Sequence, residues 1–235
     1  MTRRRWIADE VIGNRAALVG AHADHLSRVL RARVGQEFDI STEKGVRHGR
    51  ITSIHEGRVE FELGEEVSAA TELAVTLALS IFKFDRMEWA IEKCTELGIQ
   101  QIVPVIAKRT EAHLAAAAAK RVERWKRIAR EAAEQSRRTH PPDITEPVKL
   151  KDALRIPSDL RILLAEFNAV TSLSEGLRAA HGTVALAIGP EGGWTEAEHQ
   201  AFTDAGWIAA SLGTTILRAE TAAIAATAVV AAELG

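Results

Sequence analysis

From residue 73 onward the chain alternates short apolar runs with stretches of helical periodicity, and this alternation limits the fold more than any other feature. The run "LAVTLALSI" (73–81) is apolar at nearly every position, as is typical of a strand buried on both faces. Further apolar runs occupy residues 99–107, 161–167, 183–189 and 207–213, with helical segments between them. This alternation predicts an α/β domain with a mostly parallel sheet that helices cover on both sides.

The first 65 or so residues predict a smaller β structure. Strands are expected at 17–20, 37–40, 46–54 and 58–63, and a helix is expected at 21–31 with Leu26, Val29 and Leu30 on one face. The turns between the later strands contain Gly45 and Gly57, which can supply a positive φ. Several short strands spaced in this way suggest a small barrel. The polar segment 63–72 lacks periodicity and is expected to be a linker, so the sequence predicts two domains, 1–70 and 71–235.

Composition excludes several classes of protein. Of the 235 residues, 46% are hydrophobic and 26% are charged, which is typical of a soluble globular protein. The only cysteine, Cys94, excludes an internal disulfide and a multi-cysteine zinc site, and its place in an apolar helical stretch predicts that it is buried. No apolar segment suits a membrane span, so we expect a cytoplasmic protein without a membrane anchor or a metal.

The net charge of −2 conceals a basic band. The band lies in the stretch 115–138, which is expected to form one long helix that stops before Pro141. Residues 120–138 contain eight Lys/Arg and three Glu, whereas residues 139–235 contain six basic and twelve acidic side chains. A basic band is expected of a protein that binds the phosphate backbone of a nucleic acid. The solvated face of an amphipathic helix has the same composition, and both interpretations stay open. Trp125, within the band, is expected in the core.

A glycine loop follows one of the apolar runs in "VALAIGPEGGWTEAEHQAF" (184–202). Thr195 and Glu198 have the spacing of a capping box, so a helix is expected to begin there. Open α/β sheets bind ligands at the carboxyl ends of their strands, although a glycine loop alone is equally consistent with a tight turn. Glu191 would repel phosphate and Pro190 has no N–H to offer it. A neutral or cationic ligand is therefore favoured over a nucleotide phosphate.

The stretch "SLGTTILRAETAAIAATAVV" (211–230) also lies between an apolar run and a helix. It should therefore lie at the same end of the sheet as Gly189, together with the end of the run at 163–167. Three strand ends that converge in this way form a pocket. Arg218 and Glu220 could pair with each other, cap the helix or face a substrate.

The two loop motifs carry a family resemblance. "IGPEGGWTEAE" (188–198) followed by "SLGTTILRAETAA" (211–223) resembles the C-terminal motifs of the RsmE family, which methylates N3 of a uridine in 16S ribosomal RNA of the small subunit. The similarity extends to residues 83–110 and 124–138, and to the N-terminal stretches 3–10 and 25–36. Phe84, where members commonly have glycine, and "AEFN" (165–168) depart from the family pattern.

The resemblance implies a specific architecture. The family belongs to the SPOUT methyltransferases, whose α/β domain contains a deep trefoil knot that binds S-adenosylmethionine, and it has an N-terminal PUA-like β-barrel. The resemblance places the barrel in residues 1–70 as an RNA-binding domain, and the knot, the cofactor site and the dimerisation surface in residues 71–235. It implies a homodimer whose partner is small-subunit ribosomal RNA or the assembled 30S subunit.

The resemblance also implies site residues. Arg218 and Glu220 would be catalytic. The cofactor would be bound by residues at the three strand ends: Leu164, Glu166, Gly189, Pro190, Gly192, Leu212, Gly213, Leu217, Arg218, Thr221 and Ala222. RNA would be bound by mostly basic residues of the N-terminal domain and the basic band: Arg4, Arg5, Arg28, Arg31, Arg33, Gln135, Arg137 and Arg138.

The implied reaction needs N3 of the uridine to lose its proton, through a general base or a cation that stabilises the uridinate. Arg218 could stabilise that anion or hold a phosphate. Glu220 could accept the proton, orient Arg218 or form only a structural pair with it. Two alternatives to a uridine-N3 methyltransferase stay open: a trefoil-knot methyltransferase that acts on a ribose 2′-OH, and a non-catalytic RNA-binding or ribosome-assembly factor on the same scaffold.

Overall fold

The computed structural model describes residues 5–67 and 74–234, which divide into two compact units. The first unit comprises residues 1–70 together with 133–140, and the second comprises residues 71–132 together with 141–235. The first unit therefore includes the last three residues of the helix over the basic band and the segment 136–140 that follows it.

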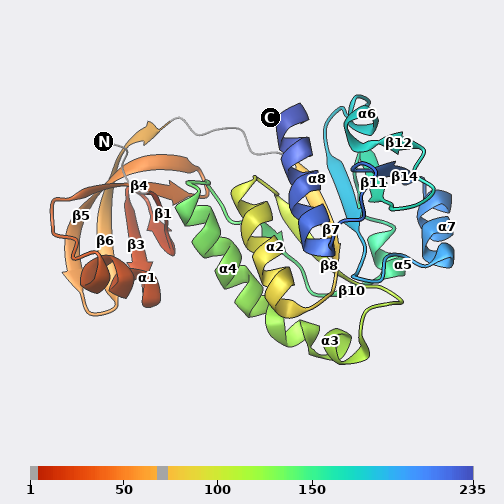
Figure 1. The fold of residues 1–235 in the computed structure, drawn as a ribbon. Coiled ribbons are helices and arrows are strands. Elements are labelled where there is room, and N and C mark those ends of the chain that lie inside the picture. Colours follow the sequence, from red (N-terminus) through yellow and green to blue (C-terminus); the bar gives the residue numbers. More distant parts are fainter. Residues whose placement is uncertain (1–4, 68–73, 235) are drawn as a thin grey trace. The chain divides into compact units, whose positions relative to one another are not determined.

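The first unit is a curled six-stranded sheet (Figure 1). All neighbouring strands are antiparallel except the first pair, which is parallel. In sheet order the strands are β1 (Arg5–Ile7), β4 (Glu37–Thr42), β5 (Gly45–His55), β6 (Arg58–Val67), β3 (Arg15–Val19) and β2 (Glu10–Ile12). Gly45 and Gly57 have φ values of 125° and 65°, as the turn assignment predicted. Leu18, Ile40 and Phe61 are among the buried residues at the centre of its core.

Two expectations for the first unit were wrong. Residues 63–67 are not a linker, because β6 continues to Val67 and pairs there with Val46 of β5. The remainder of that segment, 68–73, lies outside the described residues. The helical stretch consists of α1 (Ala21–Asp24) followed by a π-helical turn (His25–Val29), and the wider turn leaves Val29 67% exposed.

The second unit contains an eight-stranded parallel sheet (Figure 1). In sheet order its strands are β10 (Val148–Lys149), β8 (Gln101–Ile106), β7 (Val75–Ser80), β13 (Val184–Ile188), β11 (Leu160–Leu164), β14 (Ile208–Ser211) and β12 (Thr171–Ser172), with β9 (Asp143–Ile144) also paired to β8. The parallel α/β architecture predicted from the alternation is thus confirmed.

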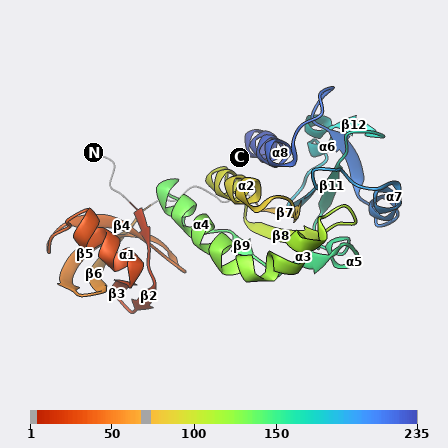
Figure 2. The ribbon, with the colours of Figure 1, turned by 60° about the horizontal axis from the view of Figure 1, so that its bottom comes forward.

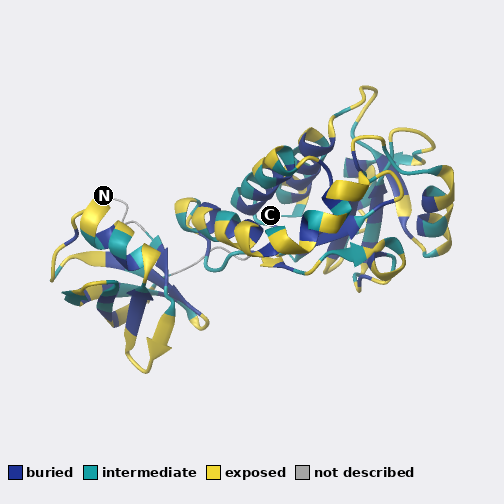
Figure 3. Ribbon diagram, turned by 90° about the horizontal axis from the view of Figure 1, so that it is seen from below, coloured by how far each residue is buried: buried dark blue, intermediate teal, exposed yellow. Residues whose placement is uncertain are grey.

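Helices cover both faces of this sheet, and alternate residues of its strands pack against helices on opposite faces. Leu77, Leu79 and Leu186 face a core formed with α2 (Phe84–Glu96), α4 (Val122–Gln135), α6 (Leu173–Leu177) and α8 (Ala219–Leu234). Ala78, Ala185 and Ala187 face α5 (Leu150–Ala153) and α7 (Glu196–Asp204). Figures 1 and 2 show α2 and α8 side by side, and Figure 3 shows buried strands beneath helices whose outer turns are exposed.

The predicted long helix over the basic band is interrupted. It consists of α3 (Ala112–Ala117), a 3₁₀ turn (Ala118–Arg121) and α4, which ends before Pro141 as expected. Trp125 of α4 is fully buried, which confirms its assignment to the core. No glycine or proline marks the interruption in the sequence.

Cys94 on α2 provides a test of the packing between α2 and α8. The side chain is fully buried, and burial raises the pKa of its thiol to about 12, despite a hydrogen bond from Thr227 of α8 at 3.4 Å. Because the thiolate is the reactive form, the folded protein should resist thiol-alkylating reagents at mildly alkaline pH and react once it unfolds in urea. Mass spectrometry of alkylated protein across a urea titration measures this. Rapid alkylation without urea would contradict the packing.

Candidate functional site

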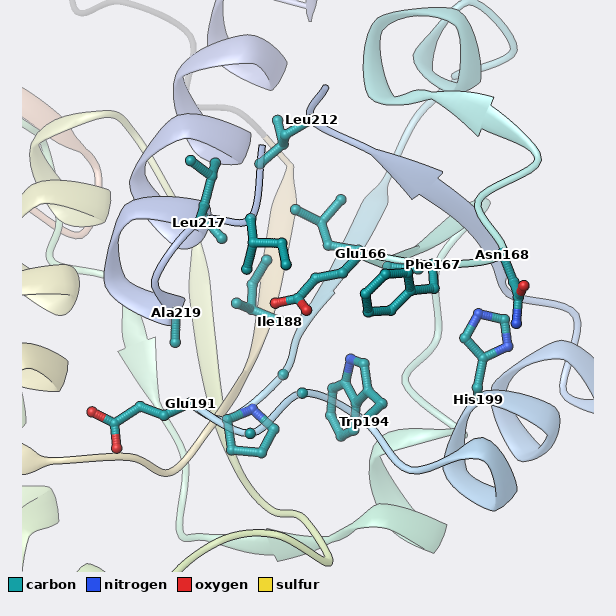
Figure 4. Close-up of a pocket in the computed structure, with 18 of the residues that line it drawn as sticks. Glu166, Phe167, Asn168, Ile188, Glu191, Trp194, His199, Leu212, Leu217 and Ala219 are labelled. Carbon is teal, nitrogen blue, oxygen red and sulfur yellow. The ribbon is translucent and has the colours of Figure 1, made fainter. Parts of the chain in front are cut away.

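Three loops at the carboxyl ends of β11, β13 and β14 enclose a cavity of about 350 Å³ (Figure 4). The strands place them together, because β11 pairs with β13 on one side and with β14 on the other. The cavity is lined by nine of the residues predicted to bind the cofactor: Leu164, Glu166, Gly189, Pro190, Gly192, Leu212, Gly213, Leu217 and Ala222. The convergence of three strand ends on one pocket is as the sequence predicted.

The other predicted site residues lie beside the cavity without lining it. Arg218 and Thr221 are exposed, whereas Glu220 is only 5% exposed. Within residues 5–67 and 74–234, the side chain of Arg218 has no ion pair, and Glu220 pairs with Arg86 instead. Of the alternatives that the sequence left open, an ion pair between Arg218 and Glu220 is therefore not found. Arg218 follows a lining residue, Leu217, and precedes another, Ala219, so it lies at the edge of the cavity.

The glycine loop is anchored where α7 begins. The Thr195 side chain accepts a hydrogen bond from the Glu198 backbone, and the Glu198 side chain accepts one from the Thr195 backbone, so the predicted capping box is present. The buried Glu198 carboxylate also accepts a hydrogen bond of 2.7 Å from the backbone N–H of Lys108, which follows β8. The first turn of α7 is thereby fixed to a neighbouring strand end.

Arg109 also holds the glycine loop and was not predicted from the sequence. Its guanidinium donates hydrogen bonds to the carbonyls of Gly192 at 2.5 Å and Trp194 at 3.4 Å. A side chain at position 192 would bring its Cβ within 3.2 Å of the Arg109 side chain, so a glycine there permits this close contact. The signal available in the sequence was the position of Arg109 directly after a buried strand.

Arg86, in the first turn of α2, is a second arginine that the sequence analysis missed. Its guanidinium donates to Glu191 at 2.9 Å and lies 3.8 Å from the Glu220 carboxylate. It therefore connects the two loop motifs, which are separated in sequence by the helix α7 and the strand β14.

The chemistry of the cavity favours a ligand with an apolar ring and a neutral or positive charge. Leu164, Ile188, Leu212 and Leu217 provide apolar walls, and the Glu166 carboxylate provides negative charge. The Nε1 of Trp194 and the Nε2 of His199, both in lining residues, are buried and have no hydrogen-bond partner among residues 5–67 and 74–234. Figure 4 shows the Glu166 and Trp194 side chains directed toward the same region. The volume is within the range of small-molecule sites, roughly 300–1,000 Å³.

The residues predicted to bind RNA belong to the first unit, which includes 133–140. Five of them are exposed: Arg28, Arg31, Arg33, Gln135 and Arg137. Arg28 is paired with Asp24 and Glu56, which neutralise part of its charge. Arg4 lies outside the described residues.

Two of the predicted RNA-binding arginines are not freely exposed. Arg138 is only 8% exposed, because the left-handed backbone of Arg137 (φ 61°) ends the helix and turns the next residue inward. It is therefore not the solvent-facing contact that the sequence suggested. Arg5 is partly buried and donates a hydrogen bond to the Arg137 carbonyl, and burial lowers the pKa of its guanidinium.

Neither a metal-binding cluster nor a membrane-spanning helix occurs among the described residues. No cluster of three or more His, Cys, Asp or Glu side chains that could hold a metal ion occurs among them. None of the helices described is long and apolar enough to cross a membrane.

Residues 69–231 match the model of a protein family described as the RNA methyltransferase domain. The chain is 34% identical over 227 residues to the ribosomal RNA small subunit methyltransferase E of Synechocystis sp., which covers 91% of this chain and 72% of that protein. The corresponding Bacillus subtilis protein is 30% identical over 219 residues, or 88% of this chain and 85% of that protein. The chain belongs to the ribosomal RNA small subunit methyltransferase E family.

Solved structures agree with this membership. The crystal structure of the Neisseria gonorrhoeae ribosomal RNA small subunit methyltransferase E bound to S-adenosyl methionine is 34% identical, with a TM-score of 0.87 over 97% of this chain and 96% of that chain. A Legionella pneumophila protein in complex with the same cofactor is 28% identical, with a TM-score of 0.86 over 99% and 98% of the two chains. The curled sheet and the parallel sheet together match the fold of these methyltransferases.

Proposed function

We propose that this RNA methyltransferase transfers the methyl group of S-adenosylmethionine to N3 of a specific uridine in small-subunit ribosomal RNA. The single observation that carries the proposal is the cavity at the ends of β11, β13 and β14, in a chain with this family membership. The solved relatives with bound S-adenosylmethionine support the choice of cofactor.

The cavity residues suit that cofactor. Leu164, Ile188, Leu212 and Leu217 would pack against the adenine, and the Glu166 carboxylate is available to a ribose hydroxyl or to positive charge. The Nε1 of Trp194, another lining residue, is a buried donor without a partner among the described residues. When bound, S-adenosylmethionine supplies an electrophilic methyl group on a sulfonium.

On the RNA side, N3 lies on the pairing edge, so the uridine must be unpaired or flipped before it reaches the cavity. Arg218 is exposed at the cavity edge, and its guanidinium would stabilise the uridinate that forms when N3 loses its proton. Glu220 is buried and paired with Arg86, which favours a role in positioning over direct proton transfer. In this proposal Arg218 stabilises the uridinate directly, and Glu220 has a positioning role.

A deep trefoil knot in the second unit is supported by the place of β14. This strand lies between β11 and β12, which follow each other in sequence, so the connection 165–170 must pass around it. Both ends of that connection hydrogen-bond to β14: the N–H of Ala165 donates to the carbonyl of Ala210, and that of Val170 to the carbonyl of Ala209. A trefoil knot forms when the chain after β14 passes beneath such a loop.

The remaining parts of the proposal concern the partners. The first unit is a PUA-like barrel that binds RNA through its exposed arginines. The second unit forms a homodimer, which is consistent with the exposed apolar side chains of Phe167 (69%), Val170 (79%) and Ile216 (70%) on the loops around the cavity. The protein acts in the cytoplasm on small-subunit RNA or the assembled 30S subunit.

Two measurements test the function. Calorimetry should detect binding of S-adenosylmethionine to the wild-type protein, and no binding with or without RNA would favour a non-catalytic ribosome-assembly factor. In cells that lack the protein, mass spectrometry of small-subunit RNA should show the loss of one N3-methyluridine, restored by the wild-type gene. The loss of a 2′-O-methyl nucleoside instead would favour the ribose 2′-OH alternative.

A further inference from the structure

One cation joins two acidic side chains from the two loop motifs. Nη1 of Arg86 donates to Oε1 of Glu191 at 2.9 Å, and Nε of the same guanidinium lies 3.8 Å from Oε1 of Glu220. Glu191 belongs to the glycine loop after β13, and Glu220 belongs to the first turn of α8. The two carboxylates therefore depend on the same arginine, which comes from a third element, α2.

Because Glu220 is buried, its carboxylate depends strongly on the contact with Arg86. Its side chain is 6% exposed, and its second oxygen, Oε2, has no hydrogen-bond partner in the part of the chain that the structure describes. A buried carboxylate needs a cation or hydrogen-bond donors to offset its desolvation, and among the described residues Arg86 is the cation that Glu220 contacts. The N-terminus of α8 contributes a further favourable interaction.

Glu191 extends the connection to the cavity wall. It lines the cavity, and Figure 4 shows its carboxylate directed away from Trp194 and Glu166, on the side opposite His199. Its neighbour Gly192 is held by Arg109. The glycine loop is therefore fixed by one arginine through a side chain and by another through backbone carbonyls.

We propose that Arg86 is a positioning residue for methyl transfer, which holds Glu220 and the glycine loop in one arrangement so that the cofactor cavity and the start of α8 keep their relative geometry. The proposal rests on the function proposed above, because it assumes that the cavity binds S-adenosylmethionine. It predicts that Arg86 acts on cofactor binding through Glu191 and on catalysis through Glu220.

The test is a double-mutant cycle with S-adenosylmethionine as the ligand, measured by calorimetry below the unfolding temperature of every variant. Arg86→Gln and Glu191→Gln should each raise the cofactor Kd by about tenfold, as expected for the loss of a charged hydrogen bond. The double variant should raise Kd no further, because both changes remove the same contact. Arg86→Lys keeps the charge and should recover part of the affinity.

A split between kcat and KM distinguishes positioning from a merely structural role. Arg86→Gln should lower kcat more than Glu191→Gln does, because only Arg86 contacts Glu220. Lys93→Gln is the matched control: Lys93 lies on the same helix, bridges Glu92 and Glu96, and is 33% exposed, against 32% for Arg86. That variant should leave Kd and kcat unchanged.

Three outcomes decide between the proposals. If the wild-type protein does not bind S-adenosylmethionine, the proposed function fails. If it binds but Arg86→Gln behaves like Lys93→Gln, or the effects of Arg86→Gln and Glu191→Gln are additive, the positioning role is wrong and the function stands. If Arg86→Gln does not fold, Arg86→Lys decides between the proposals. Wild-type kcat and cofactor Kd in that variant would exclude a role for the simultaneous contact of the Arg86 guanidinium with Glu191 and Glu220.

Discussion

The Arg218→Ala variant will lose methyl transfer by about 10²–10³-fold in kcat, the effect of removing one group that stabilises developing charge. Arg218 lies between two residues that line the cavity, its side chain is exposed, and among the described residues it has no ion pair. It is therefore free to contact a substrate without loss of a structural interaction. Single-turnover transfer of a labelled methyl group to 30S subunits measures the change.

The same variant should bind S-adenosylmethionine within about twofold of the wild type, because Arg218 does not line the cavity. Arg155→Ala is a suitable control, since Arg155 is another exposed arginine of the second unit that lies outside the cavity. Unchanged kcat in Arg218→Ala would remove Arg218 from the catalytic site. An equal loss in both variants would point to a general effect of surface charge on RNA binding.

The Gly189→Val variant will lose cofactor binding by about 100-fold or more, which corresponds to roughly 2.7 kcal/mol. Gly189 follows β13 and lines the cavity. A Cβ there would lie 3.3 Å from Nε1 of Trp194 and 3.4 Å from its backbone nitrogen. The valine must therefore displace the indole or the loop, and either movement changes the shape of the cavity. Calorimetry with S-adenosylmethionine measures the loss.

Gly64→Val adds the same side chain where it can be accommodated. Gly64 lies in β6, and a Cβ at that position meets nothing closer than 3.5 Å. This control should bind the cofactor like the wild type. Wild-type affinity in Gly189→Val would mean that the cofactor does not occupy the cavity at the three strand ends. A comparison of thermal unfolding for both variants separates lost binding from lost folding.

The sequence predicted the features that depend on local pattern. The continuous apolar run at 73–81 predicted a strand buried on both faces, and Leu77 and Ala78 do pack on opposite sides of the sheet. The spacing of Thr195 and Glu198 predicted the capping box and so the end of the glycine loop. The position of each loop after a strand was enough to bring them together, because parallel strands share a carboxyl edge.

The features that the sequence did not predict depend on long-range contacts. Arg86 and Glu191 are 105 positions apart, and Arg109 and Gly192 are 83 apart, so no local pattern relates them. The place of β14 between β11 and β12 has no counterpart in periodicity. The glutamates of "FELGEEV" (61–67) led to the prediction of a polar linker where β6 continues. Their side chains face solvent, while Val67 still pairs with β5.

The most direct test of the account is nucleoside analysis of small-subunit RNA after reaction in vitro. Purified protein is incubated with S-adenosylmethionine carrying a labelled methyl group and with 30S subunits from cells that lack the enzyme, and the digested RNA is examined by mass spectrometry. We expect the label in a single nucleoside, N3-methyluridine, with none formed by Gly189→Val. Label in a 2′-O-methyl nucleoside, or no labelled nucleoside from protein that binds the cofactor, would contradict it.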